Sequence, residues 1–315
     1  NTNPRPGFQA FIEQINRGTL SLTDLNFTIA PRINAAGRMV HGAHAVALLQ
    51  TKDINQARTM AAAIQQHNED RKELDGVITE TALLQMAQAQ ESQSATSVVY
   101  DPNWHKGVIG IVASRLIETH YRPTLVFTQS GDVMAGSARS IKGYDVYNAI
   151  DACSEHVLQF GGHMYAAGLT LKNSQYPAFK AAFEAHVSAT LDPALKIPEI
   201  QIDQEISISE ITPKFMRILK QMAPFGPENP LPVFKATGVY ETGYATAVGK
   251  DQTHLKGAFC QGASAKIPFI AFKLAHQLGL LTDQSLVDIV FHISENKWQG
   301  KSSLQLQVLD IKPTV

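Results

Sequence analysis

Cysteine is nearly absent from this sequence, with two residues among 315. Cys153 and Cys260 are too few for a disulfide framework and lack the spacing of metal ligands, which favours a reducing compartment such as the cytoplasm. No apolar run approaches the roughly 20 residues that a membrane span needs. The sequence therefore predicts a protein with no disulfide scaffold and no membrane anchor.

An excess of charge of one sign is also missing. The 27 Lys and Arg residues nearly balance the 28 Asp and Glu residues, and the formal net charge is −1. Proteins that bind polyanions without selectivity are strongly basic as a whole. Any contact with nucleic acid therefore has to be local, in a cleft lined by a few Lys and Arg residues.

Glycine-rich segments carry the clearest chemical signal. Residues 160–169, Phe-Gly-Gly-His-Met-Tyr-Ala-Ala-Gly-Leu, place two glycines and a histidine in an expected loop between two elements. Glycines let a backbone approach an anion closely, and a histidine can supply a proton or a hydrogen bond. Tight packing of a strand against a helix would explain the same residues, so this segment alone leaves both interpretations open.

Three further segments combine small and basic residues. Residues 31–39 are expected to form a turn that carries Asn34 and Arg38, and residues 104–115 a polar, basic loop that opens a helix. In residues 136–140, Ser137 and Arg139 alternate on a predicted strand, so both side chains point to one face. A hydroxyl beside a guanidinium suits a terminal phosphate.

In this order and at these intervals, the four motifs closely resemble those of the RecJ family of single-strand-specific DNA exonucleases, over nearly the whole chain. The resemblance implies release of nucleotides from single-stranded DNA in the 5′-to-3′ direction, in repair and recombination. It also implies manganese or magnesium ions, held in this DHH phosphoesterase superfamily by an aspartate-rich motif and an Asp-His-His motif.

Neither metal-binding motif occurs in this sequence, which also begins at Asn1 rather than at a methionine. We therefore expect the C-terminal part of a longer protein, with no metal ligands of its own and no nuclease activity alone. Its partners would be single-stranded DNA and, in cis, the N-terminal DHH domain.

The expected fold class is α/β plus all-β, in four stretches. They are the tail of the DHH domain (1–52), a long connector helix (53–93), a DHH-associated α/β domain (94–194) and an OB-type nucleic-acid-binding domain (195–315). The connector follows from an uninterrupted run of good helix formers. The domain names follow from the resemblance.

Shorter patterns predict the elements of the two domains. In the α/β domain they indicate strands at 97–100, 124–128, 133–140 and 166–171, and helices at 107–119, 145–158 and up to 191. In the last domain they indicate strands at 200–206, 233–248, 254–259, 267–272, 287–293 and 304–311, and helices near 210–222 and 275. The last two strands form a predicted hairpin, and the set predicts an OB-type barrel.

Candidate site residues follow from these motifs. By the resemblance, Ser137 and Arg139 help to hold a 5′ phosphate; an ordinary surface pair is the alternative. His163 is the catalytic candidate, either at a phosphate oxygen or at a metal-bound water, unless it is a half-buried histidine held by backbone. The other substrate-binding candidates are Asn34, Arg38, His105, Gly161 and Gly162. Bracing of turns would explain several of them equally well.

The predicted barrel combines basic residues with one tryptophan. Lys250, Lys256 and Trp298 are its candidates for single-strand binding, with Lys297 and Lys301 nearby. Charged hairpins that only keep an edge soluble are the alternative.

Two other functions remain open. A nanoRNA or cyclic-dinucleotide phosphodiesterase of the same superfamily shares the Gly-Gly-His motif but would not need the barrel. A non-catalytic binding module, like the appended arm of alanyl-tRNA synthetases, needs no metal motif. The sequence upstream of Asn1 would decide between an enzyme and a scaffold.

Overall fold

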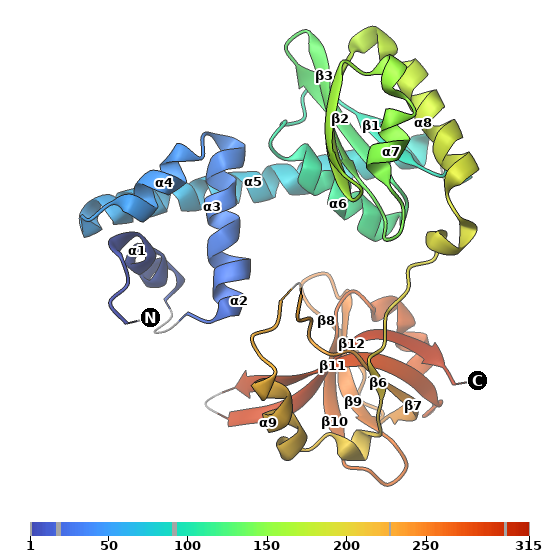
Figure 1. Cartoon of the computed structure of the whole chain (residues 1–315). Helices are drawn as coiled ribbons and strands as arrows, with labels where there is room; N and C mark the ends of the chain where they lie inside the picture. Colours follow the sequence, from blue (N-terminus) through green and yellow to red (C-terminus); the bar gives the residue numbers. More distant parts are fainter. Residues whose placement is uncertain (1, 17–19, 90–92, 227, 299–300, 315) are drawn as a thin grey trace. The chain divides into compact units, whose positions relative to one another are not determined.

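The computed structural model describes residues 2–16, 20–89, 93–226, 228–298 and 301–314. The chain divides into two compact units, Asn1–Pro198 and Glu199–Val315. Each unit has its own hydrophobic core, and the elements of both are labelled in Figure 1. Among the described helices, none is both long enough and apolar enough to cross a bilayer.

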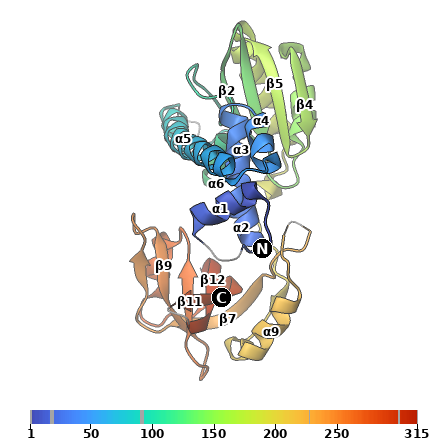
Figure 2. The same ribbon diagram turned by 90° about the vertical axis from the view of Figure 1, so that its left-hand side faces the viewer.

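The first unit begins with short helices that pack on one end of a long helix, α5 (Ile54–Gln88) (Figure 2). These are α1 (Pro6–Ile15), α3 (Ala30–Met39) and α4 (Ala43–Gln50), while α2 (Leu22–Asp24) and a π-helical turn at Leu25–Ile29 precede α3 in the chain. Phe11 and Leu48 are fully buried in the core that they share with α5.

The long helix predicted within residues 53–93 is confirmed, as α5. α5 has 35 residues, so it is about 52 Å long at 1.5 Å per residue. Its first turn is capped by Asp53, whose Oδ1 accepts hydrogen bonds from the backbone N–H groups of Asn55 and Gln56. The helix ends at Gln88, and the predicted continuation through residues 90–92 lies outside the described residues.

The second half of α5 packs against an α/β domain that contains a five-stranded sheet. Its residues Ile78 and Met86 are buried against α6 (Ile109–Thr119) and β1. The strand order is β1-β2-β3-β5-β4, with β1 parallel to β2 and the other pairs antiparallel. The strands are β1 (Ser97–Tyr100), β2 (Thr124–Ser130), β3 (Val133–Arg139), β4 (Gln159–His163) and β5 (Ala166–Lys172).

Helices α7 (Val146–Asp151) and α8 (Tyr176–Thr190) cover one face of this sheet. Phe179 and Phe183 of α8 are fully buried there, and the ring of Phe179 lies 5.8 Å from that of Phe127 on β2. The opposite face of β1 and β2 is covered by α6, because Val126 belongs to the core that α6 shares with α5.

Three local predictions for the first unit are wrong. Residues 31–39 form helix α3 rather than a turn, because Pro31 fits a first helical turn and Ala35 and Ala36 are buried. The Gly161–His163 segment is strand β4 rather than a loop, since pairing with β5 outweighs the low strand preference of glycine. The helix predicted over 145–158 ends at Asp151 and is followed by a 3₁₀ turn, Ser154–His156.

The second unit is a closed barrel, which confirms the OB-type prediction. The ring runs β7-β11-β12-β10-β9 and closes where Tyr240 and Glu241 of β7 pair with Cys260 and Phe259 of β9. Its strands are β7 (Phe234–Glu241), β9 (His254–Cys260), β10 (Ile267–Ala271), β11 (Val287–Trp298) and β12 (Lys301–Pro313). β10 and β12 are parallel, and β11 and β12 form the predicted hairpin.

Other elements of this unit depart from the predicted bounds. The run at 200–206 contains only the two-residue strand β6 (Gln204–Glu205). The run at 233–248 divides into β7 and β8 (Thr246–Val248) around Gly243, whose φ of 89° breaks the strand. Helix α9 (Pro213–Gln221) and a 3₁₀ turn (Ala275–Leu281) occupy the two places where helices were predicted.

Candidate functional site

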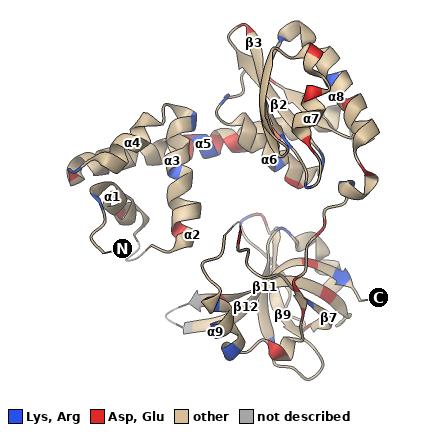
Figure 3. Ribbon diagram, viewed as in Figure 1, with Lys and Arg blue, Asp and Glu red and all other residues tan. Residues whose placement is uncertain are grey.

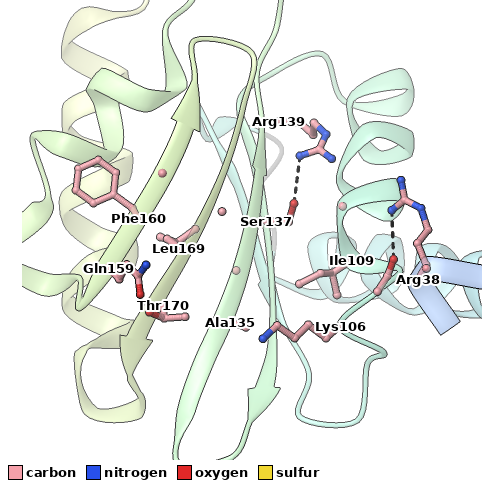
Figure 4. A pocket seen from close by; sticks show the side chains of 16 residues that line it. Arg38, Lys106, Ile109, Ala135, Ser137, Arg139, Gln159, Phe160, Leu169 and Thr170 are labelled. Carbon is pink, nitrogen blue, oxygen red and sulfur yellow. Dashed lines mark hydrogen bonds between the residues drawn. The ribbon is translucent and has the colours of Figure 1, made fainter. Parts of the chain in front are cut away.

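A cavity of about 550 Å³ opens in the first unit, beside the exposed part of the sheet (Figure 4). β3 contributes Ser137 and Arg139, and Gly161 of β4 and Gly168 of β5 lie in the same row of paired residues as Ser137. The loop before α6 and the end of α3 form the opposite wall. Residues far apart in the sequence therefore meet in one cavity.

Ser137 and Arg139 lie in direct contact on β3. Arg139 Nη1 donates hydrogen bonds to Ser137 Oγ at 3.1 Å and to the backbone oxygen of Ala138 at 2.7 Å. These bonds fix the guanidinium at the cavity wall, and Figure 4 marks the one to Ser137. Because Ser137 Oγ accepts from Arg139, its own O–H can donate to a ligand in the cavity.

Gly110 allows α6 to approach β3 closely. A Cβ at Gly110 would lie 2.9 Å from both Arg139 Nη2 and Ser137 Oγ, which is too close for a real contact. Gly110 is in the first turn of α6, so the positive end of this helix faces the same two side chains.

Arg38 adds a second guanidinium from α3. Its Nη1 donates to the backbone oxygen of Gly107 at 3.3 Å, across the cavity from the strands (Figure 4). Burial and, after it, the charge of Arg38 lower the pKa of Arg139. The two cations therefore repel each other, and an anion between them would relieve the repulsion.

Two neighbouring arginines share one carboxylate, whereas no described ion pair involves Arg38 or Arg139. In the middle of α5, where Figure 3 shows charges of both signs, Asp75 is 1% exposed. Its Oδ1 lies 2.7 Å from Arg115 Nε, a hydrogen bond that raises the pKa of Arg115, and its Oδ2 lies 3.6 Å from Arg71 Nη1. The described lining of the cavity contains Arg38, Lys106 and Arg139 but no Asp or Glu. Its charge suits an anion.

The other candidates of this unit lie outside the described lining. Asn34 is exposed one turn before Arg38 on α3, and Gly162 faces Ala167 of β5. His105 Nδ1 accepts a hydrogen bond from the backbone N–H of Gly107 at 3.1 Å, so this histidine braces the loop before α6.

His163 lies two strands away from Arg139 on the same side of the sheet. Both residues pair with Ala166 of β5, and paired residues of adjacent strands share a face. His163 Nδ1 accepts a hydrogen bond from the backbone N–H of Tyr165 at 3.2 Å. The side chain is exposed rather than half-buried.

The barrel candidates belong to the second unit. Lys250, after β8, and Lys256, on β9, are exposed. Trp298 is the last residue of β11, but its side chain, like those of Lys297 and Lys301, lies outside the described part of the structure.

Sequence reasoning missed most of the residues that line the cavity, among them Lys106, Gly110 and Gln159. Lys106 and Gly110 were inside a quoted motif, but no spacing showed that they would face β3. Gln159 precedes the Gly-Gly pair on β4 and carries no motif signal of its own.

Divalent cations do not fit this cavity. Magnesium and manganese prefer carboxylate and other oxygen ligands, and the described lining has cationic side chains instead. In the part of the chain that the structure describes, no three His, Cys, Asp or Glu side chains gather in a way that could hold a metal ion.

The first unit thus contains an α/β domain with a cationic cavity, the second is a closed five-stranded barrel, and family models match both. A model of the DHHA1 domain matches residues 92–189, and a model of the RecJ OB domain matches residues 202–310. The single-stranded-DNA-specific exonuclease RecJ of Salmonella typhimurium is 32% identical over 98% of this chain and 55% of its own length. That of Bacillus subtilis is 31% identical over 91% of this chain and 36% of its own length.

Solved structures agree with these relatives. Crystal structures of RecJ from Thermus thermophilus, in complex with Mg²⁺ or Mn²⁺, superpose with TM-scores of 0.82 and 0.83 at 29% identity. They cover 98% of this chain, which covers 47% and 44% of theirs. This chain belongs to the RecJ family. It spans about half the length of the first of these relatives.

Proposed function

We propose that this chain is the substrate-gripping part of a 5′-to-3′ single-stranded-DNA exonuclease. The observation that carries the proposal is the cavity between α6 and β3, which holds Arg38, Lys106, Arg139 and the Ser137 hydroxyl without a described carboxylate. A terminal phosphate dianion satisfies these groups, because guanidinium groups form strong, charge-assisted hydrogen bonds to phosphate oxygens. The barrel holds the strand that follows, without reading its sequence.

Within the proposal, each candidate has a limited role. Ser137, Arg139 and Arg38 contact the 5′ phosphate, and Gly161 and Gly168 leave room for the first nucleotide because they have no side chains. His163 lies farther along the same face, where it can reach a later phosphate oxygen or the leaving group.

The chemistry of cleavage belongs to other residues. In the proposal, manganese or magnesium ions activate water in a DHH domain that acts in cis. This chain binds and orients the strand, and no catalytic step passes through a metal held by its own residues. Repair and recombination of DNA in the cytoplasm are the proposed setting. The match to a RecJ OB domain favours this function over a nanoRNA or cyclic-dinucleotide phosphodiesterase.

Binding of end-labelled oligonucleotides tests the phosphate site. Arg139→Gln should weaken binding of a 5′-phosphorylated strand by about tenfold to a hundredfold, the usual worth of a hydrogen bond to a charged group. A 5′-hydroxyl strand should lose much less. Arg58→Gln is the matched control, because Arg58 is an exposed guanidinium paired only with surface groups on the same unit.

Equal losses on both strands would show that Arg139 supports the fold or the strand in general. The folding stability of Arg139→Gln distinguishes support of the fold from contact with the strand. We expect that stability to be unchanged, because burial and the charge of Arg38 both lower the pKa of Arg139 and so disfavour its charged form in the folded state. The chain alone, incubated with manganese and a 5′-phosphorylated strand, should release no mononucleotides. Release of mononucleotides in proportion to the amount of protein added would overturn the proposal that cleavage needs other residues.

A further inference from the structure

The outer face of β8, β9 and β10 carries two exposed aromatic rings. Buried and outward-facing residues alternate along these strands, so Lys256 and its partner Ile270 face away from the barrel core. Tyr244, just before β8, is 71% exposed, and Phe272, just after β10, is 52% exposed. The sequences of the three strands contain no Asp or Glu. This face is therefore aromatic and cationic.

Each ring has a defined neighbour. The ammonium of Lys266 lies over the ring of Tyr244, 5.3 Å from its centre, which is a cation–π geometry. The ring of His254 meets that of Phe272 edge-on at 5.2 Å, and its Nδ1 accepts a hydrogen bond from the backbone N–H of Lys273. Flat apolar rings beside cations match a ligand in which flat bases alternate with anionic phosphates.

A buried carboxylate holds the turn that presents Tyr244. Glu241, the last residue of β7, is 1% exposed. Its oxygens accept hydrogen bonds from the backbone N–H groups of Gly243 at 2.5 Å, Tyr244 at 3.0 Å and Ala258 at 3.2 Å. Within the described part of the chain no ion pair is formed by this carboxylate. Burial of a charge without a cationic partner is costly, so these three donors have to stabilise it.

The surrounding residues are small enough to admit this carboxylate. A Cβ at Gly257 would lie 2.8 Å from Glu241 Oε1 and 3.1 Å from the Cα of Ala245. Gly243 adopts a φ of 89°, which side chains rarely allow. A buried acid and two glycines thus order a turn whose only large side chain, Tyr244, is left in solvent.

We propose that Tyr244 and Phe272 are two base-stacking positions for a single strand, and that Glu241 is the positioning residue that preorganises Tyr244. Lys266 and Lys256 contact the phosphates beside the stacked bases. The proposal rests on the proposed function, because it assumes that the barrel holds single-stranded DNA.

The two rings are far enough apart to hold different bases. Tyr244 lies beside Ala258, whose N–H shares the Glu241 carboxylate, and Phe272 lies beside His254. Ala258 and His254 are four residues apart on β9, which is about 13 Å at 3.3 Å per residue. Each ring should therefore act on its own nucleotide.

Fluorescence anisotropy with labelled oligothymidylate and the whole chain tests the stacking positions. Tyr244→Ala and Phe272→Ala should each weaken binding by about fivefold to a hundredfold, and Tyr244→Phe should bind like the parent. Neither alanine variant should change the slope of affinity against salt, whereas Lys256→Gln should flatten it. Phe27→Ala, which removes a 78% exposed ring from the other unit, is the matched control.

A double-mutant cycle tests the role of Glu241. Glu241→Gln turns an N–H₂ group toward N–H donors, so it should weaken binding about as much as Tyr244→Ala. The two changes together should cost no more than Tyr244→Ala alone, because Glu241 acts through that ring. Additive losses would mean that Glu241 supports the barrel in general and would overturn its positioning role.

An abasic scan keeps the proposal testable even if Glu241→Gln fails to fold. Removing single bases from the oligonucleotide should abolish the effect of Tyr244→Ala at one position and that of Phe272→Ala at another. If Tyr244→Ala and Phe272→Ala bind the strand as well as the parent protein does, the stacking positions are wrong and the proposed function is unaffected. Parent protein that binds no single strand would remove both.

Discussion

At the scale of single residues, one missing methyl group decides how closely α6 approaches β3. Gly110→Ala should weaken binding of a 5′-phosphorylated strand several-fold, because its Cβ would displace the Arg139 and Ser137 side chains. The fold should tolerate it, since alanine favours a helix by about 1 kcal/mol over glycine. Binding and denaturant unfolding measure the two effects separately.

Gly76→Ala on α5 is the control for this change. No atom lies within 4 Å of the Cβ that it would add, so stability should rise by about 0.5–1 kcal/mol while phosphate binding stays unchanged. Weaker binding in both variants would mean that helix stiffness, and not access to Arg139, controls the cavity.

The sequence could predict residue pairs only where a local period relates them. Ser137 and Arg139 are two apart on a strand, so their shared face follows from alternation. Arg38 and Gly107 are 69 residues apart, and no local period brings them together. The Tyr244 turn was missed because its signal, a buried acid bonded to backbone, exists only after folding.

At the scale of elements, β4 depends on one of its two glycines. Gly162 has a φ of 153°, and a Cβ there would lie 2.6 Å from the Cα of Ala167 on β5. Gly162→Ala should therefore destabilise the first unit by about 1–3 kcal/mol. Gly161→Ala adds a methyl with no atom within 4 Å, so urea titration should show little change. Equal stabilities would show that β4 adapts to a side chain.

Elements were predictable where hydrophobic pattern and propensity agreed. β1 and the long α5 match their predictions because their residues favour the element that the pattern requires. α3 and β4 do not, since burial of Ala35 and Ala36 decides the first and pairing of Gly161 and Gly162 with β5 decides the second. Tertiary contacts overrode the local signal at both places.

At the scale of the whole molecule, the two units have separate cores. The segment between them includes Ile197, Ile200 and Ile202, which are 69%, 42% and 41% exposed. Thermolysin, which cuts before large apolar residues, should cleave this segment first and leave two folded fragments. Calorimetry should show two unfolding transitions. A single transition, together with fragments that are digested further, would mean that the units depend on each other.

The strand order of the barrel also determines when the barrel can close during synthesis of the chain. β12 pairs with β11 on one side and with β10 on the other, and it is the last strand of the ring along the chain. During synthesis from the amino terminus, β10 and β11 therefore leave the ribosome with open edges, which are templates for aggregation. The thirteen residues of β12 seal both edges at once. A premature stop shortly before Lys301 would leave β10 and β11 with two unpaired edges.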